Sequence, residues 1–410
     1  MSKLKELIRE LCPDGVNYRK LEDCCTVLDK KRKPVTKAAR EAGEYPYYGA
    51  NGIQDYVSDY IFDGTFVLVG EDGSVITKAG TPVVTWAEGK IWVNNHAHII
   101  EETDGVLLRY LFHYIQTIDV TPLIHGNIPK LTGGDFRALQ IPVPPLPVQR
   151  EIVRILDNFT ALTAELTAEL TARKKQYEFY RDKLLTFDGA KVPLLELRSV
   201  VKKSCSGSTP TKGNSEYYTN GTIPWIRTQD VRFNEITEVD SYITEKAVAE
   251  TAAKWIPENC VIVAISGATA GRCAINKIKA TTNQHCLNLE IDETKALYKY
   301  IYYCVYNKYD ELISRKQGAR GDLNSSLVLS LKIPVPSLEV QKRLVYVLDN
   351  FDAICSDLKI GLPAEIEARK KQYEFYRDAL LTYAATGIII QTDRQTDRQT
   401  DRQTDRHLRV

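Results

Sequence analysis

The sequence predicts an α+β fold in which two mixed α/β domains are separated by two long, antiparallel, coiled-coil-like helices, as a pseudo-two-fold internal repeat. Two observations carry this prediction. The block ARKKQYEFYRD occurs twice without change, at 172–182 and 368–378. Each copy lies in a long amphipathic segment, and each segment follows an insert of short strand-like runs that differs between the two halves.

The repeat extends upstream of the identical block. Residues 141–159, IPVPPLPVQREIVRILDNF, match 333–351, IPVPSLEVQKRLVYVLDNF, at an offset of 192, and a weaker match of 126–131 with 318–323 keeps that offset. The identical block is offset by 196, so the second copy holds four additional residues. The chain is therefore a repeated frame that carries two different inserts.

The segment 147–187 has no Gly, and no Pro after its first residue. Its apolar residues step by threes and fours, which predicts one long amphipathic helix. A similar stripe returns at about 340–383, where Gly361 and Pro363 predict a kink. Because an apolar stripe on an isolated helix needs a partner, we expect the two helices to pair in an antiparallel manner.

The repeat divides the chain into five segments. They are 1–146, a helix over 2–11 and the first α/β domain; 147–187, the first long helix; 188–338, the second α/β domain; 339–384, the second long helix; and 385–410, a polar tail. Strand-type runs are predicted at 45–52, 64–73, 81–85 and 91–94 in the first domain, with a helix near 106–118, and at 223–231, 260–265 and 286–291 in the second.

The amino-acid composition only loosely limits the possible partners and localisation of the chain. The chain has 410 residues, is 43% hydrophobic and carries a net charge of +1, which neither proves nor excludes a nucleic-acid partner. No apolar run reaches the roughly 18 residues of a membrane span, and the first residues lack a secretory apolar core, so we expect a cytoplasmic protein without a membrane partner. The nine cysteines are scattered and predict free thiols.

Enzyme motifs are weak. Gly267–Cys273 lacks the lysine and spacing of a phosphate loop and is interpreted as a strand-to-turn connection. His96 and His98 share a face of a strand, but no third ligand is evident from the sequence. Glu71-Asp72 is either a catalytic pair or, as we favour, part of a turn. We therefore predict no catalytic residue and no metal site.

Basic and polar side chains gather in both domains. Lysine and arginine suit phosphates, and arginine and glutamine can read base edges. For any single residue a solvated charged loop is the simpler interpretation, but as sets on two unlike domains they suggest that the chain reads DNA. The candidates are Lys30, Lys31, Arg32, Lys33, Lys37 and Tyr47 in the first domain, and Lys212, Arg227, Gln229, Arg232, Arg315, Lys316, Gln317 and Arg320 in the second.

Two variable domains that alternate with two copies of IPVP…LDNF…ARKKQYEFYRD resemble the specificity subunit of a type I restriction-modification enzyme. The resemblance covers nearly all of residues 1–384. Within the domains, YPYYGANGI (45–53), FDGTFVLVGEDG (62–73) and SGSTPTKGNSEYYTNGTIPWI (206–226) are similar to stretches of that family's target-recognition domains.

The resemblance implies that each domain reads one half of a split, asymmetric site in double-stranded DNA. It also implies that the helices bind two methyltransferase subunits and that restriction subunits complete the complex. This chain would hold no cofactor, and S-adenosylmethionine, ATP and Mg²⁺ would be used by the partners. The alternative is a stand-alone nucleic-acid-binding regulator. Helix-frame and partner-docking candidates are Ile152, Leu156, Phe159, Tyr177, Tyr180, Leu348, Phe351, Tyr373 and Tyr376.

Two short tandem repeats remain. TAELTAEL, residues 163–170, adds about 6 Å of helix per unit. Given the family, we interpret it as a ruler for the gap between half-sites, with a plain helix-forming sequence as the alternative. Residues 391–406 are four copies of QTDR, predicted to be disordered. Since CAGA repeated in the gene spells QTDR, slippage there would shift the reading frame, so we expect a phase-variable tail.

Overall fold

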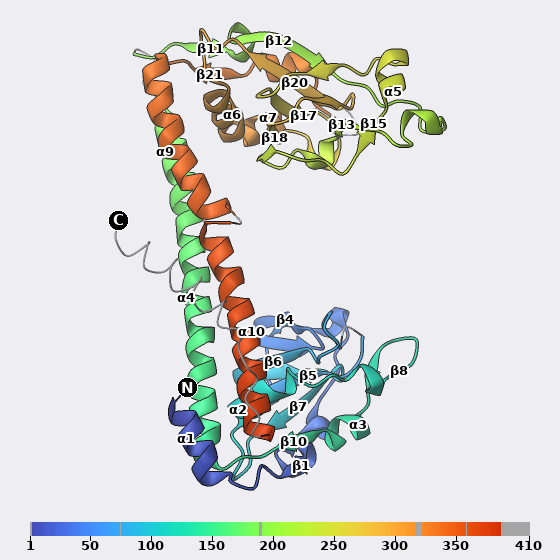
Figure 1. Ribbon diagram of the computed structural model, residues 1–410, viewed down its shortest axis with the longest axis vertical. Coiled ribbons are helices and arrows are strands. Elements are labelled where there is room, and N and C mark those ends of the chain that lie inside the picture. The colour runs from blue at the N-terminus through green and yellow to red at the C-terminus, as the bar shows by residue number, and fades with distance from the viewer. Residues whose placement is uncertain (1, 74, 188–190, 317–321, 358, 387–410) are drawn as a thin grey trace. The chain divides into compact units, whose positions relative to one another are not determined.

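The structure is a computed structural model that describes residues 2–73, 75–187, 191–316, 322–357 and 359–386 (Figure 1). The QTDR repeat therefore lies outside the described residues. The chain forms two compact units, Met1–Thr167 with Ile366–Val410, and Ala168–Glu365. Each unit holds one α/β domain and part of the helical frame. We call residues 12–145 the first head and residues 191–337 the second head.

The first long helix is continuous. Helix α4 runs over Leu146–Leu184, close to the predicted range, with Pro147 in its first turn, where the missing N–H has no helical acceptor to lose. No described helix is long and apolar enough to cross a membrane.

The second long helix is broken rather than kinked. Helix α9 covers Leu338–Ser356 and α10 covers Leu362–Thr386. Gly361 lies in the break, where a Cβ would overlap the backbone carbonyl of Ala353, so a side chain does not fit. Pro363 then falls in the first turn of α10, where proline is tolerated. The glycine and proline therefore separate two helices.

The antiparallel pairing is confirmed by ring contacts inside each unit. In the first unit Phe159 of α4 stacks on Tyr376 of α10, with ring centroids 5.3 Å apart. In the second unit Tyr180 of α4 stacks on Phe351 of α9 at 5.8 Å. Residue numbers rise along α4 while they fall along its partners, as an antiparallel pair requires.

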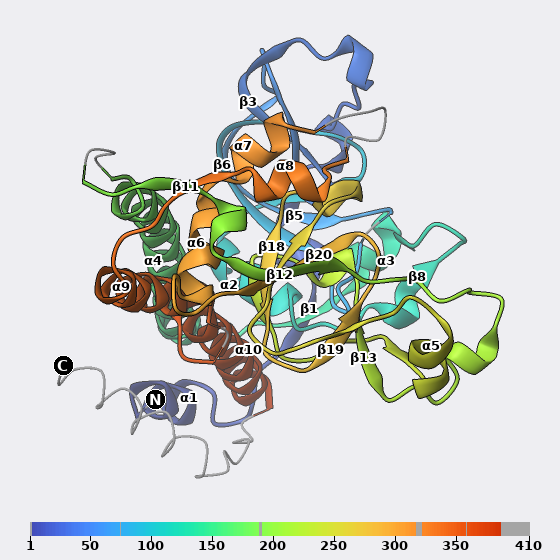
Figure 2. The same ribbon diagram turned by 90° about the horizontal axis from the view of Figure 1, so that it is seen from above.

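The first head (blue to cyan in Figure 1 and Figure 2) is built on a six-stranded sheet of order β2-β7-β5-β6-β3-β4. Only the β3–β6 pairing is parallel in this sheet. Its strands are β2 (Thr26–Val27), β3 (Ala42–Gly49), β4 (Gly52–Val57), β5 (Phe62–Gly70), β6 (Val84–Val93) and β7 (Ala97–Glu101). The other elements of this unit are α1 (Ser2–Leu11), α2 (Leu108–Ile115), α3 (Gly133–Ala138), β1 (Tyr18–Lys20), β8 (Ile124–His125), β9 (Lys130–Leu131) and β10 (Gln140–Pro142).

The second head is built on two sheets, of orders β12-β20-β17-β18-β14 and β15-β13-β19-β16. Their strands are β12 (Val201–Ser206), β13 (Ile223–Ile226), β14 (Asn234–Ile236), β15 (Tyr242–Ile243), β16 (Trp255–Ile256), β17 (Val261–Ala264), β18 (Cys273–Asn276), β19 (Ala280–Thr282) and β20 (Cys286–Ile291). The remaining elements are β11 (Leu194–Glu196), β21 (Lys332–Pro334), α5 (Glu245–Glu250), α6 (Tyr298–Asn307), α7 (Tyr309–Ser314) and α8 (Ser325–Leu329). As predicted, the Gly267–Cys273 stretch joins strand β17 to strand β18.

Each head is joined to its long helix by a buried glutamine from the repeated frame. Gln149 accepts a hydrogen bond from the backbone N–H of Leu107 (2.9 Å) and donates to the carbonyl of Pro144 (2.8 Å). Gln341, 192 residues later, accepts from Leu297 (2.9 Å) and donates to Pro336 (2.8 Å). The repeat therefore preserves an attachment as well as a helix pattern.

A tyrosine of each head completes this attachment. The Tyr110 hydroxyl donates to the carbonyl of Pro142 (2.8 Å), and the Tyr300 hydroxyl donates to that of Pro334 (3.0 Å). The two prolines end the short strands β10 and β21, which pair with β1 and β11 in the same antiparallel register. Two inserts with little sequence in common therefore join the frame through the same bonds.

Candidate nucleic-acid interface

Both heads carry the same short turn, which we call the Asn-x-His turn (residues 94–96 and 283–285). The Asn94 side chain accepts from the backbone N–H of His96 at 2.8 Å, and Asn283 accepts from His285 at 3.1 Å. These bonds from a backbone N–H to an asparagine side chain fix the same local turn in two heads whose residues differ. Each turn is also hydrogen-bonded to the strand beside it.

The neighbouring strand ends at the same place in each head. The N–H of Asn94 donates to the carbonyl of Tyr48 in β3 (3.1 Å), and the N–H of Asn283 donates to that of Ile226 in β13 (3.0 Å). In both heads this strand runs parallel to the one that leads into the turn. Tyr48 and Ile226 are therefore equivalent.

A surface cavity lies beside this point in each head. The cavity of the first head has a volume of about 380 Å³ and is lined by Ala50, Asn51, Gln54, Asp72, Gly73, His96 and Ile128. The cavity of the second head has a volume of about 680 Å³ and is lined by Thr209, Lys212, Ser215, Tyr218, Thr219, Trp225, Arg227, Asp240, Ser241, Tyr242 and Asn283. Both linings offer hydrogen-bond donors and acceptors to a ligand.

Four lysines predicted to contact DNA are exposed on the first head. Lys30, Lys31, Lys33 and Lys37 lie on the segment between β2 and β3, in or next to short 3₁₀ turns. None of them forms an ion pair with a described residue. Their charges are therefore free to meet phosphates.

Tyr47 and Arg32 of the first head correct the sequence prediction. Tyr47 is only 1% exposed, and its hydroxyl is held by the backbone of Val35, so it packs inside the head and cannot reach DNA in this conformation. The Arg32 side chain is 12% exposed, and its guanidinium donates to Glu71 and to the carbonyl of Ala97, both at 2.6 Å. Arg32 is thus committed to internal ion pairs.

The second-head candidates separate into two groups. Lys212 and Arg227 line the same cavity, and Gln229 and Arg232 are exposed nearby in sequence. Arg315 instead forms an ion pair with Glu311 and donates to the carbonyl of Leu327 and the hydroxyl of Ser330, so it joins α7 to α8. Lys316 is partly buried, and Gln317 and Arg320 lie outside the described residues.

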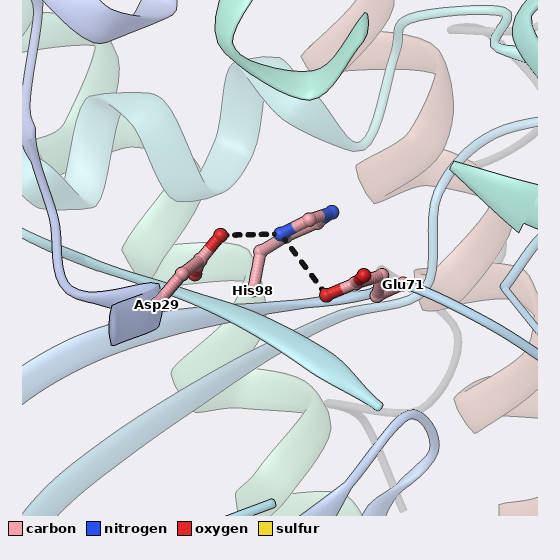
Figure 3. Close-up of side chains that lie close together, drawn as sticks. All are labelled: Asp29, Glu71 and His98. Atoms are coloured by element: carbon pink, nitrogen blue, oxygen red, sulfur yellow. Dashed lines mark hydrogen bonds and ion pairs between the residues drawn. The ribbon is translucent and has the colours of Figure 1, made fainter. Parts of the chain in front are cut away.

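A charged cluster in the first head was missed because its members are far apart in the sequence. Asp29, Glu71 and His98 offer ligand atoms within 4.8 Å of one another (Figure 3). His98 Nδ1 lies 2.8 Å from Asp29 and 3.6 Å from Glu71, while Nε2 lies 3.0 Å from the carbonyl of Leu131. From the sequence, His98 could be paired only with its near neighbour His96. In the structure the partners of His98 are Asp29, which follows strand β2, and Glu71, which follows strand β5.

Basic side chains of the same head form ion pairs with the carboxylates of this cluster. Arg32 pairs with Glu71 at 2.6 Å and with Asp29 at 3.7 Å, and Lys130 and Arg137 add ion pairs to the same carboxylates at 3.2 and 3.6 Å. Burial opposes ionisation of Asp29, but His98, the backbone N–H of Ile99 and the Arg32 charge together outweigh it and lower the pKa of this carboxyl. We interpret the cluster as a buried ion-pair network, since a metal ion would have to displace Arg32.

The frame residues proposed for docking are used mainly inside the chain. Ile152, Leu156 and Leu348 are fully buried, Tyr177 is 6% exposed, and Phe159, Phe351, Tyr373 and Tyr376 are partly buried against the partner helix or head. Only Tyr180 of this set is substantially exposed. The docking part of that prediction is therefore wrong for the buried members, which hold the frame together.

Two phenylalanines of the frame were missed. Phe179 is 61% exposed and Phe375 is 46% exposed, and they occupy the same position of the identical block, one in each unit. They lie off the apolar stripe of their helices. An apolar residue outside the stripe in both copies of a repeat is the sequence signal that could have identified them.

The heads and frame define a DNA specificity protein, as comparison with known proteins shows. The model of the type I restriction modification DNA specificity domain matches residues 13–173 and 193–368. A putative type I restriction enzyme specificity subunit from Haemophilus influenzae is 34% identical over 386 residues, covering 90% of this chain and 96% of that protein. A type I specificity subunit from Escherichia coli is 37% identical over 295 residues, covering 69% and 72%.

Solved structures share the fold. The S subunit of a type I system from M. genitalium superposes with a TM-score of 0.53 at 15% identity, covering 92% of this chain and 97% of that one. A chain from a structural study of type I R-M complex assembly gives a TM-score of 0.59 at 16% identity, covering 90% and 98%. The chain belongs to the type I restriction-modification DNA specificity family. Subunits of this family recognise DNA, and catalysis is not their role.

Proposed function

We propose that this chain reads a bipartite, asymmetric site in double-stranded DNA, with one half-site for each head. The observation that carries the proposal is that the two heads share one set of hydrogen bonds around the Asn-x-His turn, while different polar side chains line the cavity beside it in each head. A common scaffold with unlike linings suits a protein that reads two different sequences.

The partners are two methyltransferase subunits, joined in the restricting complex by restriction subunits. Phe179 and Phe375 support the docking of two identical subunits, since each unit exposes the same aromatic side chain from the same block. Large exposed apolar side chains often mark an interface, and a repeated surface can bind two copies of one partner.

The partner subunits carry out the catalytic reactions. They use S-adenosylmethionine for methyl transfer to adenine and ATP with Mg²⁺ for translocation and cleavage. In this chain the strongest candidate for a catalytic carboxylate pair is Glu71 and Asp72. Glu71 forms ion pairs with Arg32 and Lys130, and Asp72 shares a hydrogen bond with His96. The complex acts in the cytoplasm, where its DNA target lies.

The TAELTAEL stretch sets the gap between the half-sites. It is an uninterrupted part of α4, in which Thr163 and Thr167 return hydrogen bonds to the carbonyls four residues earlier. Deleting residues 163–166 removes about 6 Å of helix, so the gap is expected to shrink by one or two base pairs. Methylation mapping that showed altered half-sites instead would contradict the ruler.

The main test is co-expression of this chain with a candidate adenine methyltransferase subunit, followed by measurement of the mass of the complex and by methylome sequencing. A stable complex that methylates one bipartite motif is the expected result. A chain that binds DNA alone, and neither associates with the methyltransferase nor directs methylation, would identify a stand-alone nucleic-acid-binding regulator.

Docking has its own test. Phe179→Ala and Phe375→Ala should each weaken binding of one methyltransferase subunit, and the double variant should abolish the larger complex. Tyr346→Ala is the matched control, because Tyr346 is 71% exposed on α9 but has Arg154 at the equivalent place of the first repeat. Equal losses of methyltransferase binding in the three single variants would contradict a docking surface based on the repeat.

A further inference from the structure

The residue that follows Tyr48 or Ile226 stands at one equivalent position in the two heads. In the first head it is Gly49, and in the second it is Arg227. Both lie where the strand leaves the sheet beside the Asn-x-His turn, next to the cavities described above. The smallest and one of the largest side chains therefore occupy the same point of the fold.

In the first head another residue fills that space. A Cβ at Gly49 would overlap the carboxamide of Gln54, which reaches over Gly49 from β4. The Gln54 side-chain oxygen accepts from the Asn94 side chain at 3.3 Å, and Gln54 lines the cavity. The glycine thus makes room for a carboxamide that is anchored to the Asn-x-His turn and faces solvent.

In the second head Arg227 fills the space itself. Its backbone N–H donates to Asp230 at 2.8 Å, and its guanidinium lies 5.8 Å from the ring of Trp225. Its Nε is buried without a hydrogen-bond partner, and Arg227 forms no ion pair with any described residue. A buried donor without a partner is costly, and Arg227 also lines the cavity, where a bound ligand would offer acceptors to its guanidinium.

We propose that Gln54 and Arg227 occupy one base-reading position in the two heads, with Arg227 reading a guanine of the half-site bound by the second head and Gln54 reading an adenine of the other half-site. A planar guanidinium can donate to O6 and N7 of guanine, and a carboxamide suits N6 and N7 of adenine. The assignment rests on the proposed function and names the residues that carry its specificity.

A base contact fits these two residues better than a phosphate contact. Exposed cations such as Lys30, Lys31 and Lys33 suit phosphate contacts, which carry no sequence information. Arg227 is instead fixed at its backbone and lies over an aromatic ring, and Gln54 is neutral and anchored. Donors that are held in one orientation discriminate between bases, because they cannot turn to find another acceptor when the wrong base is present.

The test uses the complex of the full chain with methyltransferase subunits and compares methylome motifs. Arg227→Gln should lower methylation of the original motif about 10-fold or more and change or relax one guanine position in one half-site, leaving the other half-site intact. Arg227→Lys keeps the charge but loses the planar fork, so it should relax the same position. Lys212→Gln removes a candidate phosphate contact from the same cavity, so it should lower methylation of the motif without changing the base required at any position.

Gln54→Ala completes the test from the first head. It should relax one adenine position of the other half-site and leave the guanine read by Arg227 unchanged. A motif that keeps every position in Arg227→Gln and Arg227→Lys, at whatever rate, overturns the assignment and makes Arg227 a phosphate contact. If the unaltered chain directs no bipartite methylation, the proposed function fails instead, and these variants do not bear on it.

Discussion

One point of the fold is charged in the first head and apolar in the second. The N–H of Glu71 donates to the carbonyl of His96, and the N–H of Ile265 donates to that of His285, at 2.8 and 2.9 Å. Glu71 and Ile265 are therefore equivalent. The pairing of Gly70 with Ala97 and of Ala264 with Cys286 makes the next residues, His98 and Leu287, equivalent as well.

The difference shows which interactions specify the head. The backbone bond from Leu131 to Glu71 and the bond from Leu323 to Ile265 have the same length, 2.8 Å, although one acceptor residue is charged and the other aliphatic. Replacing a buried ion pair by apolar side chains is often neutral or stabilising. The ion-pair network is thus one of two ways to fill the same interior, which agrees with a packing role rather than a catalytic one.

The largest effect on stability is expected when a cation is removed from this ion-pair network and its carboxylates remain. Arg32→Ala leaves the carboxylates of Asp29 and Glu71 with fewer cations, so the first head should lose about 3–5 kcal/mol of stability. Urea unfolding, with hydrogen exchange of β5 and β7, measures it. Lys20→Ala, which removes the exposed Lys20–Glu22 pair, should cost less than about 1 kcal/mol. A stable Arg32→Ala head with weakened DNA binding would restore Arg32 as a DNA contact.

A smaller effect is expected when the first head is given the residues of the second. The double variant Glu71→Ile/His98→Leu removes a negative charge and its imidazole neighbour together, while Arg32 keeps Asp29. It should cost less than about 2 kcal/mol, and less than the sum of the two single variants. Additive losses in the double-mutant cycle would show that Glu71 and His98 do not act as one network.

The identical block contains the same tyrosine in two environments. In the first unit the Tyr373 hydroxyl lies 2.9 Å from His113 Nδ1, whose Nε2 lies 3.0 Å from Asp157. Burial lowers the pKa of His113, which favours the neutral ring that accepts from this hydroxyl. In the second unit the Tyr177 hydroxyl is buried without a hydrogen-bond partner among the described residues.

Tyrosine-to-phenylalanine variants test this comparison through the stability of each unit, measured by urea unfolding. Tyr373→Phe removes a buried hydrogen bond and leaves His113 unsatisfied, so the first unit should lose about 1 kcal/mol. Tyr177→Phe removes a hydroxyl that has no bond to lose, so the second unit should be unchanged or slightly more stable. Equal losses in the two variants would mean that Tyr177 has an acceptor that this conformation does not provide.

The frame could be predicted from the sequence because repeats and helical periodicity are local signals. The stripe of α4 can be read directly from residue order. Gly361 and Pro363 mark where the second long helix is interrupted, although the sequence predicted a kink and the structure has a break. The sites could not be predicted in the same way, since Asp29, Glu71 and His98 converge only when three distant elements pair. Tyr47 and Arg32 looked like surface residues because composition shows which side chains can bind DNA, while sheet pairing decides which of them are buried.

The smallest expected effect concerns Asp352 of α9, whose equivalent in the first repeat is Thr160. Burial raises the pKa of Asp352, and the neighbouring charge of Asp349 raises it further. A carboxyl whose pKa is higher in the folded state stabilises the fold when protonated, and that contribution is lost as the pH rises through the folded pKa. Relative to the unaltered chain, Asp352→Asn should therefore gain stability as the pH is raised from about 4 to 7. Urea midpoints at several pH values measure this, with Thr160→Asn as the control. A pH-independent difference for Asp352→Asn would show that its carboxylate remains well solvated in the folded frame.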